Sequence, residues 1–192
     1  LCASPDFVQH SESDCAGHPL YDHRLAPTIV WLSCNACTHI FTAGYFTPEA
    51  CEILFGKTHD HQTLGSQYEQ NRPIAARMID KVLPYASDGP WLDIGIGNGA
   101  LLFTADEYGF HPIGTDLRAE NVALLRSVGI EAHQADIVDL QLAQPCSVIS
   151  MADVLEHMPF PKRGLEAANR LLRDDGVLFL SMPNSDSLLW KL

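Results

Sequence analysis

The stretch that decides the fold is WLDIGIGNGALL, residues 91–102. It begins as a short apolar run typical of a buried strand, and it passes through three glycines at alternate positions, Gly95, Gly97 and Gly99. A helical pattern begins at Ala100. Glycine lets the backbone approach a ligand closely, and a helix N-terminus offers free N–H groups. The stretch therefore predicts a strand–turn–helix cradle for a ligand, in preference to a plain tight turn.

Short apolar runs and helical patterns alternate around this stretch. The expected strands cover residues 90–94, 112–116, 131–134, 147–151 and 177–182. The expected helices cover residues 71–83, 98–108, 119–128 and 162–173, and Asp174–Gly176 should form the turn into the last strand. Strands that alternate with helices predict an α/β fold with a doubly wound, Rossmann-like, mostly parallel sheet.

The chain divides by composition into three parts. Residues 1–45 form a small cysteine-rich module, residues 46–88 a linker with N-terminal helices, and residues 89–192 the α/β domain. His59 and His61 fall in a segment that we expect to be a solvated loop. With 192 residues and 46% hydrophobic residues, the chain can bury one core and carry a small appendage.

The charge and hydropathy of the chain limit its partners. The formal charge is −12, which repels phosphate backbones, so we expect no nucleic-acid partner. No apolar run approaches the roughly 20 residues that span a bilayer, so we expect no membrane partner either. No secretory signal is visible, which favours a cytoplasmic protein with reduced thiols.

Four of the six cysteines lie in the first 45 residues. Cys34 and Cys37 form a C-x-x-C pair, and zinc sites use such pairs because a tight turn brings two thiolates onto one ion. The second pair is open: either Cys2 with a cysteine upstream of the sequence, or Cys15 with His18. A redox pair and ordinary buried thiols are the alternatives. We expect a zinc-ribbon-like module with Cys2, Cys34 and Cys37 as zinc ligands.

Acidic residues stand at the ends of four predicted strands, namely Asp93, Asp116, Asp136 and Asp153. Ligands of such sheets bind at the carboxyl ends of the strands, and an acid after the second strand commonly accepts the hydroxyls of a ribose. Asp136 stands beside an apolar residue, a combination suited to the amino group and ring face of an adenine. Any one of these acids could simply cap a helix, but four at successive strand ends predict a nucleoside site.

The spacing of the glycines separates two classes of cofactor. Dinucleotide sites have G-x-G-x-x-G, because a pyrophosphate lies on the helix end. This chain has G-x-G-x-G preceded by Asp93. The acidic cradle better suits a cofactor with a cationic amine and a sulfonium, so a nicotinamide-dependent oxidoreductase is the alternative.

These motifs resemble those of the class I S-adenosylmethionine-dependent methyltransferases. The resemblance covers residues 90–183 in order and spacing, and it rests on residues 92–99, 114–117, 135–137, 153–157 and 171–178. It implies contacts to the methionine moiety from Gly95, Gly97 and Gly99, with Asp93 near its amino end. It further implies that Asp116 binds the ribose, that Leu117 lies against the adenine, that Asp136 and Ile137 hold the adenine edge, and that Met151 lines the methyl-donor pocket.

The segment from Asp153 to His157 resembles a signature of ubiquinone-type O-methyltransferases. Some of those enzymes have E-x-x-E-H there and bind a divalent metal, whereas this chain has D-x-x-E-H. Three interpretations stay open: a metal at Asp153, Glu156 and His157, a general base at His157, or a helix cap. Glu156 and His157 are the candidate catalytic residues.

The resemblance implies methyl transfer from S-adenosylmethionine. The acidic surface favours a small-molecule acceptor that receives the methyl group on oxygen or carbon, and the cysteine spacing adds zinc as a second expected cofactor. The alternative is a methyltransferase-like, zinc-binding interaction protein without turnover. The family sheet has seven strands, whereas this sequence ends soon after five, where Ser185–Trp190 would begin a helix. We therefore expect a fragment, or a second chain that covers the exposed sheet edge, and a homodimer is compatible with the latter.

Overall fold

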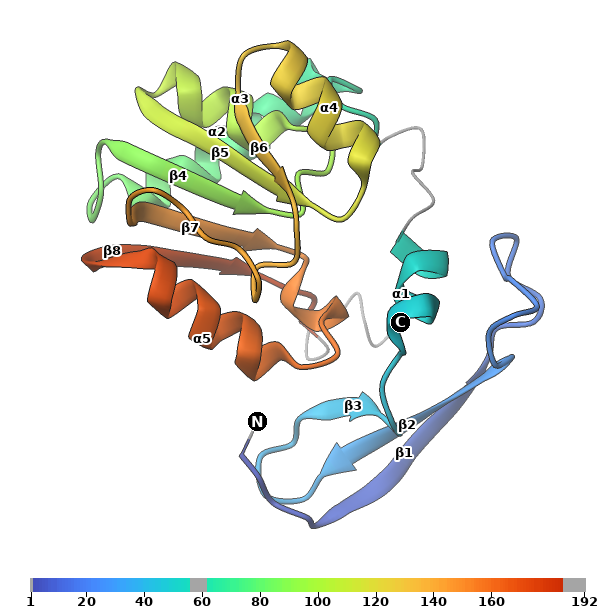
Figure 1. The fold of residues 1–192 in the computed structure, drawn as a ribbon. Coiled ribbons are helices and arrows are strands. Elements are labelled where there is room, and N and C mark those ends of the chain that lie inside the picture. The colour runs from blue at the N-terminus through green and yellow to red at the C-terminus, as the bar shows by residue number, and fades with distance from the viewer. Residues whose placement is uncertain (1, 56–61, 185–192) are drawn as a thin grey trace. The chain divides into compact units, whose positions relative to one another are not determined.

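The structure is a computed structural model that describes residues 2–55 and 62–184 (Figure 1). The chain forms two compact units, Leu1–Lys57 and Thr58–Leu192. The His59 and His61 pair and the helix expected from Ser185 lie outside the described residues. Each unit is considered by itself below.

The first unit contains a three-stranded antiparallel sheet in the order β1-β2-β3. Its strands are β1 (Phe7–Asp14), β2 (Thr28–Cys34) and β3 (Ile40–Thr42). The helix α1 (Pro48–Phe55) follows, and the amide of Ala50 donates to Thr47 Oγ1 over 3.3 Å. Threonine as the cap and proline in the first turn are therefore the reason why the helix begins here.

The second unit is a parallel α/β sheet in the order β6-β5-β4-β7-β8 (Figure 1). Its strands are β4 (Gly89–Ile94), β5 (Phe110–Asp116), β6 (Glu131–Gln134), β7 (Cys146–Ala152) and β8 (Leu172–Ser181). Its helices are α2 (Tyr68–Val82), α3 (Ala100–Glu107), α4 (Ala119–Ser127), the 3₁₀ turn η2 (Leu155–His157) and α5 (Pro161–Leu171). The predicted Rossmann-like sheet is confirmed. The chain moves outward from β4 through β5 and β6 and then returns to the other side of β4 at β7, so the switch point lies between β4 and β7.

Helices cover both faces of this sheet. Neighbouring residues of a strand point to opposite faces, so Trp91 and Leu92 belong to different core clusters. Trp91 packs with residues of α2 and α3, and its ring meets that of Phe110 edge to face with centroids 4.9 Å apart. Leu92 packs in the cluster that contains Ala168 of α5. The central strand β4 therefore packs against core side chains on both faces, and this packing holds the carboxyl end of the strand in place.

The expected turn at Asp174–Gly176 is wrong, because these residues lie inside β8. The pairing partner of Cys146 is Leu172, and that of Val148 is Val177. β7 thus advances by two residues while β8 advances by five, which is a bulge. A Cβ on Gly176 would lie 3.0 Å from the carbonyl oxygen of Cys146, so the bulge needs glycine there.

Among the helices in the described part of the chain, none has the length and apolar character needed to cross a membrane.

Candidate cofactor site

The glycine turn after β4 has a backbone that favours glycine at three positions. Gly95, Gly97 and Gly99 have φ angles of +75°, +54° and +79°. A Cβ on Gly95 would lie 2.8 Å from Val154 Cγ2, and one on Gly99 would lie 2.6 Å from Leu64 Cδ1. A Cβ on Gly97 would meet nothing closer than 4.0 Å. Internal packing therefore explains two of the glycines, whereas at Gly97 no side chain lies within 4 Å of the Cβ position.

Two asparagines that the sequence analysis missed hold this turn. Asn121 of α4 is buried, and its Nδ2 donates to the carbonyl of Gly97 over 3.1 Å. Asn98 Nδ2 donates to the carbonyl of Ser66 over 2.7 Å, and the amide of Gly65 donates to the carbonyl of Asn98 over 2.9 Å. The segment before α2 is thus attached to the turn. Asn98 lies inside the quoted motif, whereas nothing local in the sequence marks Asn121.

Asp93 is a buried carboxyl group at the end of β4, with 3% of its surface exposed. Ser150, its partner across the β4–β7 pair, donates to Asp93 Oδ1 over 2.6 Å. Trp91 Nε1 in turn donates to Ser150 Oγ over 2.8 Å. Burial raises the pKa of Asp93 to about 7, against the lowering effect of the Ser150 hydrogen bond and with a further raising effect from the charge of Asp116. A bound cation would favour the charged form of this group.

Asp116 lies at the end of the neighbouring strand β5, as the sequence predicts, and it is buried there. Both of its oxygens already have partners. The amide of Arg118 donates to Oδ1 over 2.9 Å, Arg118 Nε donates to Oδ1 over 2.9 Å, and Nη2 donates to Oδ2 over 2.7 Å. Sequence reasoning missed Arg118, although a basic residue two positions after the acid is a visible signal.

The residues expected around the adenine differ in their surroundings. Leu117 is 53% exposed, and Asp136 is exposed with its carboxylate accepting the amide of Val138 over 2.9 Å. Ile137 and Met151, in contrast, are 1% and 0% exposed within one apolar core cluster. These two side chains are thus enclosed by α5 and the sheet, and their expected contacts with the cofactor stay predictions.

The loop after β6 is held from α5 by Arg170, which the sequence analysis also missed. Arg170 Nη2 donates to the carbonyls of Ile137, Val138 and Leu140 over 3.5, 3.1 and 3.2 Å. One guanidinium thus fixes the loop that carries Asp136.

The candidate catalytic residues Glu156 and His157 are exposed on η2. Val154, which immediately precedes η2, contacts Gly95, so η2 follows directly from a contact with the glycine turn. Asp153 has a φ of +54° and is tied to β8, because its amide donates to the carbonyl of Ser181 over 2.9 Å and Ser181 Oγ donates to Asp153 Oδ1 over 3.1 Å.

The metal interpretation of this segment is corrected. Across residues 2–55 and 62–184, the one group of three or more histidine, cysteine or acidic residues with converging ligand atoms is Cys2, Cys34 and Cys37. Asp153, Glu156 and His157 do not converge in this way, because Asp153 is held by β8.

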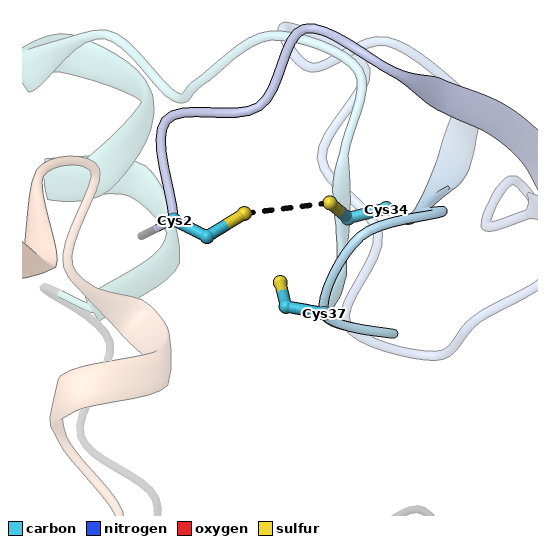
Figure 2. Close-up of side chains that lie close together, drawn as sticks. All are labelled: Cys2, Cys34 and Cys37. Carbon is cyan, nitrogen blue, oxygen red and sulfur yellow. Dashed lines mark hydrogen bonds between the residues drawn. The ribbon is translucent and has the colours of Figure 1, made fainter.

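The cysteine cluster lies in the first unit and brings together segments that are far apart in sequence (Figure 2). The three Sγ atoms lie within 4.8 Å of one another, and Cys2 Sγ is 3.5 Å from Cys34 Sγ. The amide of Thr38 donates to the carbonyl of Cys34, which closes the turn that carries Cys37. A hydrogen bond with the backbone of Ser4, followed by those with the other two thiols, lowers the pKa of Cys2 to about 7. Thiolate character is what a metal ligand needs.

Cys15 and His18 are not part of this cluster, so the alternative in which they complete the site is wrong. In the β1–β2 pair, Phe7 lies opposite Cys34, whereas Asp14 lies opposite Thr28. Cys15 follows Asp14 and therefore lies at the other end of the hairpin, about 20 Å away at the usual rise per strand residue.

Comparison with known proteins decides the family. Residues 68–191 match the methyltransferase domain family. The chain belongs to this family. S-adenosylmethionine is the cofactor of the family, which agrees with the cofactor expected from the glycine and acid pattern.

Curated relatives of this methyltransferase-domain protein include ubiquinone biosynthesis O-methyltransferases. The one from Xylella fastidiosa (strain 9a5c) is 33% identical over 120 residues, which are 58% of this chain and 48% of the relative. The one from Haemophilus ducreyi is 31% identical over 105 residues, which are 48% of this chain and 44% of the relative. The chain thus spans about half the length of the curated relatives that it matches.

Solved structures show the same fold. CalS10, an amino pentose methyltransferase from Micromonospora echinaspora with bound S-adenosylmethionine, has a TM-score of 0.51 at 23% identity and covers 62% of this chain and 52% of its own. The N-methyltransferase NodS from Bradyrhizobium japonicum, in complex with S-adenosyl-L-homocysteine, has a TM-score of 0.50 at 16% identity and covers 59% and 61%. At these identities the likeness concerns the fold alone.

Proposed function

We propose that the α/β unit binds S-adenosylmethionine and transfers its methyl group to an oxygen or carbon atom of a small molecule. The observation that carries the proposal is the pair of buried carboxyl groups, Asp93 and Asp116, at adjacent strand ends beside a glycine turn whose middle glycine has no side chain within 4 Å of its Cβ position. Two acids suit a ligand with a cationic amine and a ribose diol, and they disfavour a pyrophosphate.

Each part of this cofactor has a candidate partner among these residues. Gly95, Gly97 and Gly99 would border the methionine moiety, with Asp93 at its ammonium. Asp116 would accept the ribose hydroxyls. Exposed Leu117 and Asp136 would lie along the adenine, and Ile137 would contribute its backbone, since its side chain belongs to the core.

The bound cofactor supplies a methyl group on a positively charged sulfur, which leaves readily when a nucleophile attacks. The protein's main task is then to align the acceptor and exclude water, an effect worth about 7–11 kcal/mol in favourable cases. His157 would take the proton from a hydroxyl acceptor as the acceptor oxygen forms its bond to the methyl carbon and the carbon–sulfur bond breaks. Glu156 would orient or charge-balance the histidine.

A hydroxylated acceptor is favoured over nucleic acid by the net charge of −12 and by the O-methyltransferase names of the relatives. The test is incubation of the full chain with S-adenosylmethionine carrying a CD₃ group and a panel of catechols, phenols and sugars, with products read by mass. A product heavier by one CD₃ in place of hydrogen, reduced in His157→Ala, supports the proposal. Labelled product from RNA alone would contradict the choice of acceptor.

We also propose that Cys2, Cys34 and Cys37 bind zinc and form a ribbon-like module. Three converging thiols, one with a lowered pKa, supply three of the four tetrahedral ligands that structural zinc takes. Elemental analysis should find about one zinc per chain in the wild type and in Cys15→Ser, a matched control at the far end of the hairpin, but much less in Cys34→Ser. Metal below a few tenths of an equivalent in the wild type would contradict the site.

A further inference from the structure

The carboxylate proposed to bind the ribose is already engaged by a group of the protein itself. A carboxylate accepts about four hydrogen bonds, two on each oxygen. Oδ1 of Asp116 accepts two, from the amide and Nε of Arg118, and Oδ2 accepts one from Nη2. Within the part of the chain that the structure describes, one acceptor position is left, whereas a ribose diol that donates both protons needs two.

The pair is also well buried. The side chains of Arg118 and Asp116 are 11% and 5% exposed. A bidentate ion pair that is largely shielded from solvent is a strong internal interaction, because water screens it less than it screens a pair at the surface. The diol therefore competes with this guanidinium and not with loosely held water.

We infer that Arg118 is a displaceable internal competitor for the ribose site, so that it weakens nucleoside binding and makes occupancy depend on a full vicinal diol. The inference rests on the proposed function, since it takes Asp116 as the ribose acceptor. The acid does not need the guanidinium for its orientation, because the amide of Arg118 donates to Oδ1 independently of the side chain.

The displaced guanidinium has a partner close by. Arg118 Nη1 already donates to Gln62 Oε1 over 3.4 Å, on the segment before α2 that Asn98 attaches to the glycine turn. Arg118 can thus leave Asp116 and keep a hydrogen bond at the edge of the same site. A diol offers two donors in place of the fork, whereas a 2′-deoxy ribose offers one and replaces the guanidinium incompletely.

The test is calorimetric titration of the full chain with S-adenosylhomocysteine, comparing the wild type with Arg118→Met. Arg118→Met should bind about tenfold more tightly, a gain of about 1.4 kcal/mol, because no ion pair has to be broken. Arg126→Met is the matched control on α4, where Arg126 Nε donates to the carbonyl of Ala132 and not to Asp116. The affinity of Arg126→Met should stay within about twofold of the wild type, because Arg126 makes no hydrogen bond with Asp116. Removing an arginine from α4 does not by itself tighten binding.

A second variant protects the test against misfolding. Arg118→Lys keeps a charge but not the fork, and should bind with intermediate affinity. If folded Arg118→Met or Arg118→Lys binds S-adenosylhomocysteine as tightly as the wild type or more weakly, Arg118 is not a competitor for the ribose site. Binding by the wild type would in that case still support the proposed function. No binding by any form, wild type included, would overturn the proposed function and this inference with it.

Discussion

Replacing Asp93 by asparagine should stabilise the unliganded protein, and should do so increasingly as the pH rises. The carboxyl group is 3% exposed, and burial raises its pKa from the ordinary 3.8 to about 7. The folded state therefore holds a proton that the unfolded state releases, so wild-type stability is fully present below about pH 4 and falls as the pH rises through 7. An amide of the same shape has no proton to lose.

The magnitude follows from the pKa. A rise from 3.8 to about 7 corresponds to about 4 kcal/mol of unfolding free energy, reached above the folded-state pKa. The variant keeps an oxygen that can accept the Ser150 hydrogen bond, so little else changes. The gain should be near zero at pH 4 and about 4 kcal/mol at pH 8.

Urea unfolding followed by circular dichroism at 222 nm measures this difference, because most helices belong to the second unit. Asp106→Asn, which removes an exposed carboxyl from α3, is the matched control and should follow the wild type at every pH. A gain for Asp93→Asn that does not change between pH 4 and pH 8 would refute the argument from burial. The same variant should bind S-adenosylhomocysteine at least tenfold more weakly at pH 8, because the ligand's ammonium loses its counter-charge.

Two further changes separate packing from binding around the glycine turn and the loop after β6. Gly97→Ala, with no side chain near its Cβ, should cost only the roughly 1–2 kcal/mol of a left-handed backbone but weaken S-adenosylhomocysteine binding at least tenfold. Gly99→Ala should cost about 2–4 kcal/mol of unfolding free energy, because its Cβ would meet Leu64. Urea unfolding and calorimetry measure the two effects separately, and a Gly97→Ala protein that binds normally would show that no ligand lies beside Gly97. Arg170→Met should lower the unfolding free energy by about 1–2 kcal/mol, because the loop after β6 loses its hydrogen bonds to the guanidinium. It should also weaken binding of S-adenosylhomocysteine more than binding of S-ribosylhomocysteine, which lacks the adenine base. Lys162→Met, at an exposed position of α5, is the control, and equal losses for both ligands would show that Arg170 does not support the adenine side of the site.

The α/β architecture was readable from the sequence because strands and helices have different periods. The apolar run that begins at Trp91 and the glycines after it fixed the first strand and its turn to within a residue or two. The turn predicted at Asp174–Gly176 was wrong, because residues that favour a turn also favour a bulge. Only the pairing of β8 with β7 distinguishes the two.

The candidate site was readable only in part. Asp93 and Asp116 were found because strand ends converge in a parallel sheet, whatever the details of packing. Their partners Ser150 and Arg118 were missed, since one depends on the register between strands 57 residues apart and the other on a side-chain direction. The burial of Met151 in the core was not foreseen, because a strand-end position predicts nearness to the site but not the face to which the side chain points.

The proposed zinc ligands show the same limit in the first unit. The sequence predicts Cys2 beside the C-x-x-C pair, but spacing alone left Cys15 with His18 as an open alternative. The antiparallel register of β1 and β2 separates them, because it places Phe7, and not Asp14, beside Cys34.

The measurement that tests the central claim most directly is calorimetric titration of the full chain with S-adenosylhomocysteine and, separately, with NAD. The account predicts one site for S-adenosylhomocysteine, no binding of NAD, and affinity at least tenfold weaker in Asp116→Ala, a loss of at least about 1.4 kcal/mol. Binding of NAD alone, or an affinity for S-adenosylhomocysteine that Asp116→Ala leaves unchanged, would contradict it.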